Sequence, residues 1–199
     1  MIATNFFEGN FALLIVIGVF IFLLIVGSIY FFVELIRIEK LFKQNRFKKC
    51  KRAIKRVNFF LTSKKYNQGM YSYLGAINFA EGNTAEALRY LEKINLSKLL
   101  EIRYFWECAI FLSDDVFDIA KEKYKMFLST NPKIEINAYI LNCIFAVHDD
   151  INKMTLETLK SVMSKITHPK ILEYCQGLLE KNKILSETSE ELSPETEKK

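Results

Sequence analysis

The chain has 199 residues, half of them hydrophobic, with 28 Lys or Arg, 23 Asp or Glu and a formal net charge of +5. Only seven glycines and three prolines occur, and the segments between them repeat at helical period, which favours an all-α fold. The four cysteines stand far apart without a C-x-x-C pair. That spacing argues against a disulfide scaffold or a thiolate metal cluster and indicates buried free thiols in a reducing compartment.

The first predicted element is a transmembrane helix over residues 11–33. No charge lies between Glu8 and Glu34, and the run is almost purely Phe, Leu, Ile, Val and Gly. As a helix it is about 34 Å long, enough to cross a hydrocarbon core of about 30 Å. A cleaved signal peptide is the main alternative, but no Lys or Arg precedes the run and no small-residue cleavage pattern follows it. We therefore predict an uncleaved anchor after a short extracytoplasmic N-terminus, residues 1–10.

Residues 34–65 are predicted to form basic juxtamembrane helices. Residues 37–65 carry twelve Lys or Arg against one acid, whereas residues 66–199 carry 16 basic and 20 acidic side chains. The positive-inside rule then places the C-terminal domain in the cytoplasm and the N-terminus outside. The basic stretch either only orients the anchor or also contacts anionic lipid, while a nucleic-acid role is not expected, since core-type apolar residues interleave with it. The residues assigned to the membrane surface are Lys48, Lys49, Lys51, Arg52, Lys55 and Arg56.

Residues 66–185 are predicted to form a repeat-built helical domain. An aromatic residue, a Leu-Gly pair, a Gly-Asn turn and then small and large apolar residues follow one another at fixed spacing. They are Tyr71, Leu74, Gly75, Gly82, Asn83, Ala87 and Leu91. This stretch resembles a tetratricopeptide repeat, in which small residues let two helices approach closely.

Further copies of the pattern follow on either side. Ala120 lies 33 residues after Ala87, and Pro132 falls where the family places its closing proline. A more divergent copy begins near Glu135, and residues 47–57 look like the second helix of an upstream copy. The resemblance implies a tetratricopeptide-like (TPR-like) α-solenoid of helix pairs after the single transmembrane helix.

The C-terminal end is predicted to be a capping helix and a tail. Proline at position 169 suits the first position of a helix, and the apolar residues of 170–185 occupy one face, as in a solenoid cap. Residues 186–199 are acidic and nearly free of apolar residues, which predicts a disordered tail.

No catalytic or metal chemistry is indicated. The sequence contains no Gly-rich phosphate loop and no nucleophile motif, and His148 and His168 fall in expected turns, where we expect solvated side chains. We therefore expect no enzyme activity, no cofactor and no metal site.

The resemblance implies a partner-binding scaffold, because tetratricopeptide domains take up a peptide or helix in a concave groove. By position in the repeat, the groove would be lined by Phe79, Phe105, Leu112 and Tyr139. These side chains are apolar or aromatic, so an apolar helix or peptide segment of a protein partner is the expected ligand. The alternative is that they are packed against each other or against the capping helix.

Three functions are compatible with this layout. The first is a membrane-anchored scaffold or adaptor that binds a protein partner on the cytoplasmic side. The others are a structural accessory subunit of a larger membrane complex and a protein-targeting receptor. Because the sequence is rich in Lys, Asn and Ile, we expect a bacterial plasma membrane.

Overall fold

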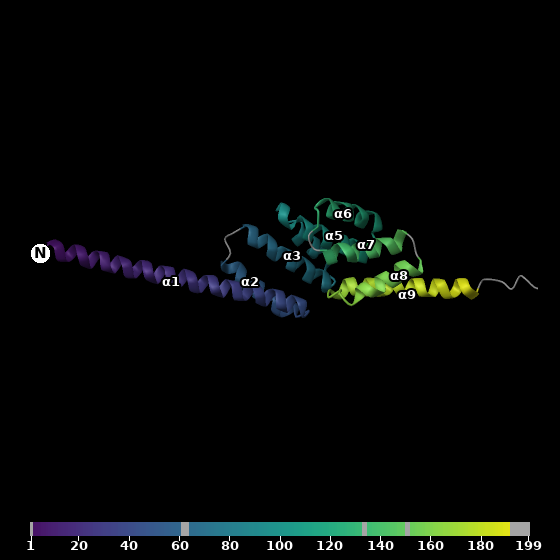
Figure 1. The fold of residues 1–199 in the computed structure, drawn as a ribbon, viewed down its shortest axis with the longest axis horizontal. Helices are drawn as coiled ribbons and strands as arrows, with labels where there is room; N and C mark the ends of the chain where they lie inside the picture. The colour runs from purple at the N-terminus through teal and green to yellow at the C-terminus, as the bar shows by residue number, and fades with distance from the viewer. Residues whose placement is uncertain (1, 61–63, 133–134, 150–151, 192–199) are drawn as a thin grey trace, which may run out of the picture. The chain divides into compact units, whose positions relative to one another are not determined.

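A computed structural model describes residues 2–60, 64–132, 135–149 and 152–191 (Figure 1). Over these ranges the backbone forms nine α-helices and one short 3-10 helix, and no strand. The all-α class predicted from the sequence is thus confirmed. The chain divides into two compact units, Met1–Leu61 and Thr62–Lys199.

The first unit is a long helix followed by a shorter one that folds back on it. Helix α1 spans Ile2–Lys43 and α2 spans Phe47–Phe60. The turn between them reverses the chain within three residues, with Asn45 in the left-handed region at φ 54°. Asparagine is one of the few residues that adopt this conformation at low cost, so the sequence suits a tight reversal here.

The second unit consists of consecutive helices that pack in pairs. Helix α3 packs against α4, α5 against α6, and α7 against α8. The bounds are α3 Lys64–Ala80, α4 Thr84–Leu91, η1 Ser97–Leu99, α5 Leu100–Ser113, α6 Phe117–Ser129, α7 Glu135–Asp149, α8 Lys153–Met163 and α9 Pro169–Glu191. Helix α9 lies against α3, α5 and α8.

Helices α3 and α4 approach closely at Gly75. A β-carbon built there would lie 2.8 Å from Leu91 Cδ2, and Ala87 is fully buried on the facing helix. Gly82, at φ 82°, closes the turn between α3 and α4, a conformation that side chains rarely adopt. The Leu-Gly and Gly-Asn positions quoted for the repeat thus have a steric reason: one lets the helices touch and the other turns the chain.

The C-terminal helix starts where the sequence predicts and ends later. Pro169 is its first residue, as expected. It continues to Glu191, so Ser186 to Glu191, predicted as the start of a disordered tail, are helical. Residues 192–199 of the predicted tail lie outside the described residues.

Candidate functional surfaces

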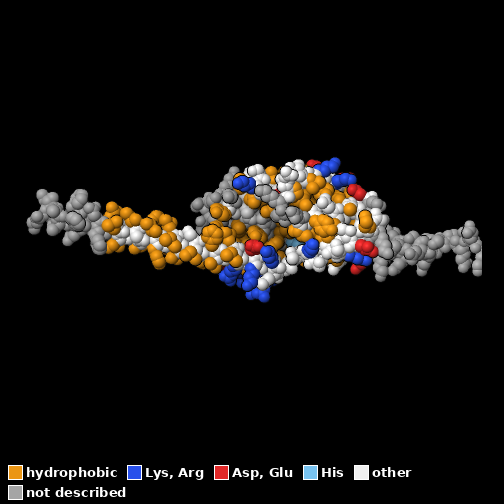
Figure 2. All heavy atoms as spheres, viewed as in Figure 1, with side chains coloured by type: hydrophobic (Ala, Val, Ile, Leu, Met, Phe, Trp, Pro, Cys, Tyr) orange, Lys and Arg blue, Asp and Glu red, His pale blue; other side chains and the backbone are white. Residues whose placement is uncertain are grey.

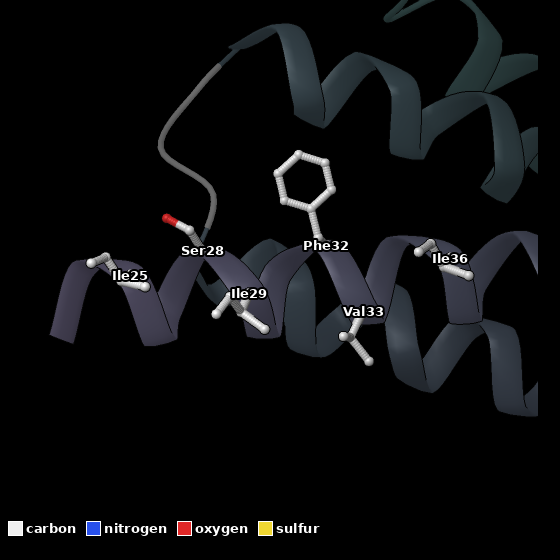
Figure 3. A pocket seen from close by; sticks show the side chains of 6 residues that line it. All are labelled: Ile25, Ser28, Ile29, Phe32, Val33 and Ile36. Carbon is white, nitrogen blue, oxygen red and sulfur yellow. The ribbon is translucent and has the colours of Figure 1, made fainter. Parts of the chain in front are cut away.

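The apolar length of α1 has the properties of a membrane-spanning segment. Within Leu13–Lys43 it is long and apolar enough to cross a membrane, and its side chains from Leu13 to Val33 are almost all exposed. A shallow apolar depression of about 480 Å³ runs along one face, where the side chains recur every three or four residues (Figure 3). Its lining residues are Ile25, Ser28, Ile29, Phe32, Val33 and Ile36. The Ser28 hydroxyl donates to the Leu24 carbonyl at 2.8 Å, so even this polar group is satisfied within the helix.

Helix α2 carries all six residues predicted for the membrane surface. It has no acidic residue, and Lys48, Arg52 and Lys55 are exposed. Its buried side chains are Cys50, Ala53, Ile54 and Val57. Because a helix turns about 100° per residue, Lys48, Arg52 and Lys55 point away from this apolar face. Figure 2 shows Lys and Arg gathered over the hairpin of α1 and α2, next to the apolar length of α1.

Among the contacts between α1 and α2, two polar ones define the register of the pair. The Cys50 thiol lies 3.6 Å from the Ile38 carbonyl, near the turn. Further along, Arg56 Nη2 donates to both carboxylate oxygens of Glu34, at 3.3 and 3.4 Å. Glu34 also accepts from Arg37 at 3.3 Å, and its side chain is only 6% exposed. We call this cluster of Glu34, Arg37 and Arg56 the clasp.

Three of the four predicted groove residues are core residues. Phe79, Phe105 and Leu112 are 1%, 3% and 2% exposed and belong to one continuous hydrophobic core, so they do not line an open surface. Tyr139 alone is exposed, at 43%. This arrangement agrees with the alternative in which these side chains are packed.

The packing over Phe79 comes from the start of α9. The imidazole of His168 stacks on the Phe79 ring at 5.1 Å between centroids and lies 4.8 Å from the Trp106 ring. Its Nε2 lies 3.0 Å from the Ala76 carbonyl; a carbonyl can only accept, so Nε2 carries the proton. His168 is 5% exposed, and the expectation that it is a solvated turn residue is wrong.

The environment of His168 disfavours its charged form. Burial lowers the pKa of His168 to about 4, against the opposing effect of the hydrogen bond to the Ala76 carbonyl. Nδ1 is buried without a hydrogen-bond partner. His168 is therefore a neutral residue that inserts between α3 and α5 and fastens α9 to them.

His148 is exposed, as expected, and it also contacts α9. It lies in the last turn of α7, and its Nε2 is 2.7 Å from the Tyr174 hydroxyl of α9. Partial desolvation of the ring lowers the pKa of His148 and the Lys181 ammonium lowers it further, against the opposing effect of the Asp149 and Asp115 carboxylates. The two histidines thus connect α9 to different helices.

Tyr139 lies in a depression of about 560 Å³ on the second unit. The depression is formed by the start of α7 and the segments that precede α7 and α9. Its lining residues are Pro132, Ile136, Ala138, Tyr139, Asn142 and Lys165. The Tyr124 hydroxyl donates to Asn142 Oδ1. The lining combines apolar side chains with the polar groups of Tyr139 and Asn142 and with one cation, Lys165, so it suits a segment that offers both an apolar side chain and a carboxylate.

A buried carboxylate in α5 was not singled out from the sequence. Glu107, with a side chain 3% exposed, accepts from Arg103 Nε at 2.6 Å and lies 3.0 Å from Lys123 Nζ. Arg103 Nη1 also donates to the Ile94 carbonyl. The cluster joins α5, α6 and the segment that follows α4. The sequence feature that could have indicated it is a single acid in an otherwise apolar part of α5, four residues after an arginine.

The four cysteines are free and buried, as predicted. Burial raises the pKa of Cys50 to about 11 and those of Cys108 and Cys175 to about 12. Thiolates are the nucleophiles, so these thiols are held in their unreactive form. Over the described residues, no group of three or more His, Cys, Asp or Glu side chains is placed to hold a metal ion.

Comparison of the chain with known protein families, with curated proteins and with solved structures finds no match.

Proposed function

We propose that the chain is a single-pass membrane-anchored scaffold, with its second unit in the cytoplasm as a TPR-like helix-pair solenoid that binds a protein partner. The observation that carries the proposal is the contrast between the two units. Apolar side chains of α1 are exposed over the length of a membrane, whereas the second unit buries a hydrophobic core of its own. A helix apolar on all faces favours a lipid environment, and a domain with its own core favours water.

The orientation rests on charge. The basic excess follows the apolar run, and α2 has six basic residues and no acid. Moving such a segment across a membrane is disfavoured, so the C-terminal unit stays in the cytoplasm. A bacterial plasma membrane is proposed from the composition.

The partner site is proposed at the depression beside Tyr139. Phe79, Phe105 and Leu112 are core residues, so the groove inferred from the repeat is closed there by its own chain. Tyr139 stays exposed in a depression with Lys165 at its edge. The proposed ligand is therefore a short segment of a partner protein with an apolar side chain and a nearby acid.

Reporter fusions test the orientation. A reporter active only in the cytoplasm, fused after Lys199, is expected to be active, and one active only outside is expected to be silent. The reverse pattern would overturn the assigned topology.

Site-specific crosslinking tests the partner site. A photoreactive residue at Tyr139 of the membrane-bound chain is expected to trap a discrete partner, and one at exposed Lys160 of α8 serves as the matched control. Tyr139→Asp should abolish the crosslink obtained from a photoreactive residue at Lys165. Identical products from Tyr139 and Lys160, or no product from either Tyr139 or Lys165, would count against this site. A partner recovered at fixed stoichiometry would indicate a subunit of a larger complex rather than an adaptor.

A further inference from the structure

In the first unit, α2 folds back beside α1 toward the end of the apolar run at Val33. Residue pairs Ile38–Cys50 and Glu34–Arg56 are in contact, so the helices are antiparallel. In this register, Lys48 to Arg56 run beside the first turns of α1 that follow Val33. At 1.5 Å per residue, all six basic residues of α2 lie within about 12 Å of the end of the apolar run. A straight continuation of α1 would instead place Arg56 about 34 Å from that end.

This distance decides whether the basic side chains of α2 can interact electrostatically with a membrane surface. The polar headgroup layer is roughly 5–8 Å deep on each side, and the attraction of an anionic leaflet falls off within a Debye length of about 8 Å at physiological salt. With α2 folded back, much of its charge lies in or next to that layer. With α2 extended, most of it would lie outside.

The orientation of the charges also suits a surface. Lys48, Arg52 and Lys55, which we call the basic stripe, occupy positions i, i+4 and i+7 on the face opposite the buried residues of α2. The two acids of α1 in this region are engaged elsewhere: Glu39 pairs with Lys43 at 2.7 Å, and Glu34 forms the clasp. The stripe therefore presents one sign of charge along one face of a helix.

The clasp fixes this geometry at the border itself. Glu34 is the first charged residue after the apolar run, and its buried carboxylate holds Arg56 at the end of α2 that lies nearest the span. Arg56 keeps 46% of its side chain exposed, so it remains accessible from outside. Glu34 is thus a positioning residue for α2.

We propose that the hairpin of α1 and α2 is a binding element for anionic lipid, in which the basic stripe of α2 contacts acidic headgroups at the cytoplasmic border of the span. The proposal rests on the proposed membrane anchoring by α1. The stripe confers headgroup selectivity on the anchor and restrains the orientation of α2 at the surface.

The test uses the full chain in phosphatidylcholine vesicles with a trace of spin-labelled phosphatidylglycerol or spin-labelled phosphatidylcholine. The fraction of each label that is immobilised by the protein gives a relative association constant. One basic residue near an anionic surface is worth about a five-fold preference, so the unmodified chain is expected to prefer phosphatidylglycerol by about this factor or more. The preference should shrink as salt is raised.

Three variants isolate the stripe. Lys48→Gln with Arg52→Gln and Lys55→Gln should bring the preference close to unity. The charge-conserving set Lys48→Arg, Arg52→Lys and Lys55→Arg should retain it. The matched control replaces exposed Lys98, Lys125 and Lys160 of the second unit with Gln, an equal change in net charge, and should also retain it.

Each outcome bears on the proposal. Equal preferences in the unmodified chain and the stripe variant, or an equal loss in the control, would refute it. Binding of a duplex DNA oligonucleotide that depends on the stripe, without any lipid preference, would replace it with a nucleic-acid site. Extraction of the vesicles at alkaline pH separates the two proposals: a chain that is released is not anchored and both fail, whereas a retained chain without lipid preference refutes only the lipid site.

Discussion

Glu34 and Arg56 stand 22 residues apart in the sequence, and two hydrogen bonds of 3.3 and 3.4 Å join them across the hairpin of α1 and α2. The two side chains differ in solvent exposure: that of Glu34 is 6% exposed and that of Arg56 is 46% exposed. Removing the arginine leaves a buried carboxylate with only Arg37, whereas removing the carboxylate leaves a guanidinium that water can solvate.

The first prediction follows from this difference in exposure. Arg56→Gln should loosen α2 by about 2–3 kcal/mol, below the full cost of breaking a buried pair because Arg37 remains. Glu34→Gln should cost about 1 kcal/mol or less. Hydrogen exchange of the α2 amides in the full chain measures both, and protection in Arg56→Gln equal to that in the unmodified chain would show that the clasp does not hold α2.

The second prediction concerns Ala87, which is fully buried between α3 and α4. Ala87→Arg should unfold the second unit, because an overpacked and buried charge costs several kcal/mol, comparable to the stability of a domain. Ala85→Arg, on the exposed face of the same helix, is the matched control and should change stability by about 0.5 kcal/mol or less. Thermal melts followed by circular dichroism compare them; similar melting temperatures would contradict this packing of α4.

The third prediction separates core from surface among the residues inferred from the repeat. Phe105→Ser or Leu112→Ser should each lower the free energy of unfolding by roughly 2–5 kcal/mol, because each leaves a cavity and a buried hydroxyl. Tyr139→Ser should lower it by about 1 kcal/mol or less, since Tyr139 is exposed. Denaturant melts measure all three, and a small effect at both Phe105 and Leu112 would mean that the groove is open after all.

The fourth prediction is a pH dependence that originates at His168. Its pKa is about 4 in the folded chain, below the ordinary histidine value of 6.5, so the unfolded chain takes up the proton first as the pH falls. The stability contributed by the neutral imidazole is therefore complete above about pH 6.5 and is lost between pH 6.5 and 4, a total of about 3 kcal/mol. The variant His168→Gln should lack this component of the pH profile, although carboxylates titrate in both proteins. Parallel profiles of stability against pH would contradict the assignment.

The fifth prediction concerns the thiols. Because burial raises the pKa values of Cys50, Cys108 and Cys175 to about 11–12, all native thiols should react slowly with a water-soluble disulfide reagent until the chain unfolds. A thiol introduced by Ala85→Cys, on the exposed face of α4, should react at once and serves as the internal standard. A native thiol that reacts as fast as this standard would show that its burial is incomplete.

The local features of the fold were predictable from local sequence. The Gly-Asn turn after α3 and the start of α9 at Pro169 each depend on residues that are neighbours in the chain. Propensity and periodicity report on such neighbours directly.

The candidate site was less predictable, because it depends on contacts between distant segments. His168 precedes a proline and so resembled a turn residue, but its burial comes from Phe79 and Trp106, which lie 89 and 62 residues earlier in the chain. The same insertion closes the groove that the repeat pattern would leave open at Phe79. A repeat pattern describes how neighbouring pairs stack, and it carries no information on which segment returns to cover them.

Helix α1 is continuous, so its two ends cannot rotate independently about the helix axis. The helix runs through the apolar segment to Lys43 without interruption, and Ile38, which faces α2, lies only five residues after Val33. One residue inserted just before Glu34 would therefore rotate α2 about the axis of α1 by about 100° and move it along that axis by about 1.5 Å. The direction in which α2 faces is thus fixed relative to the faces of the apolar segment of α1, so that a rotation of the apolar segment about its axis turns α2 by the same angle.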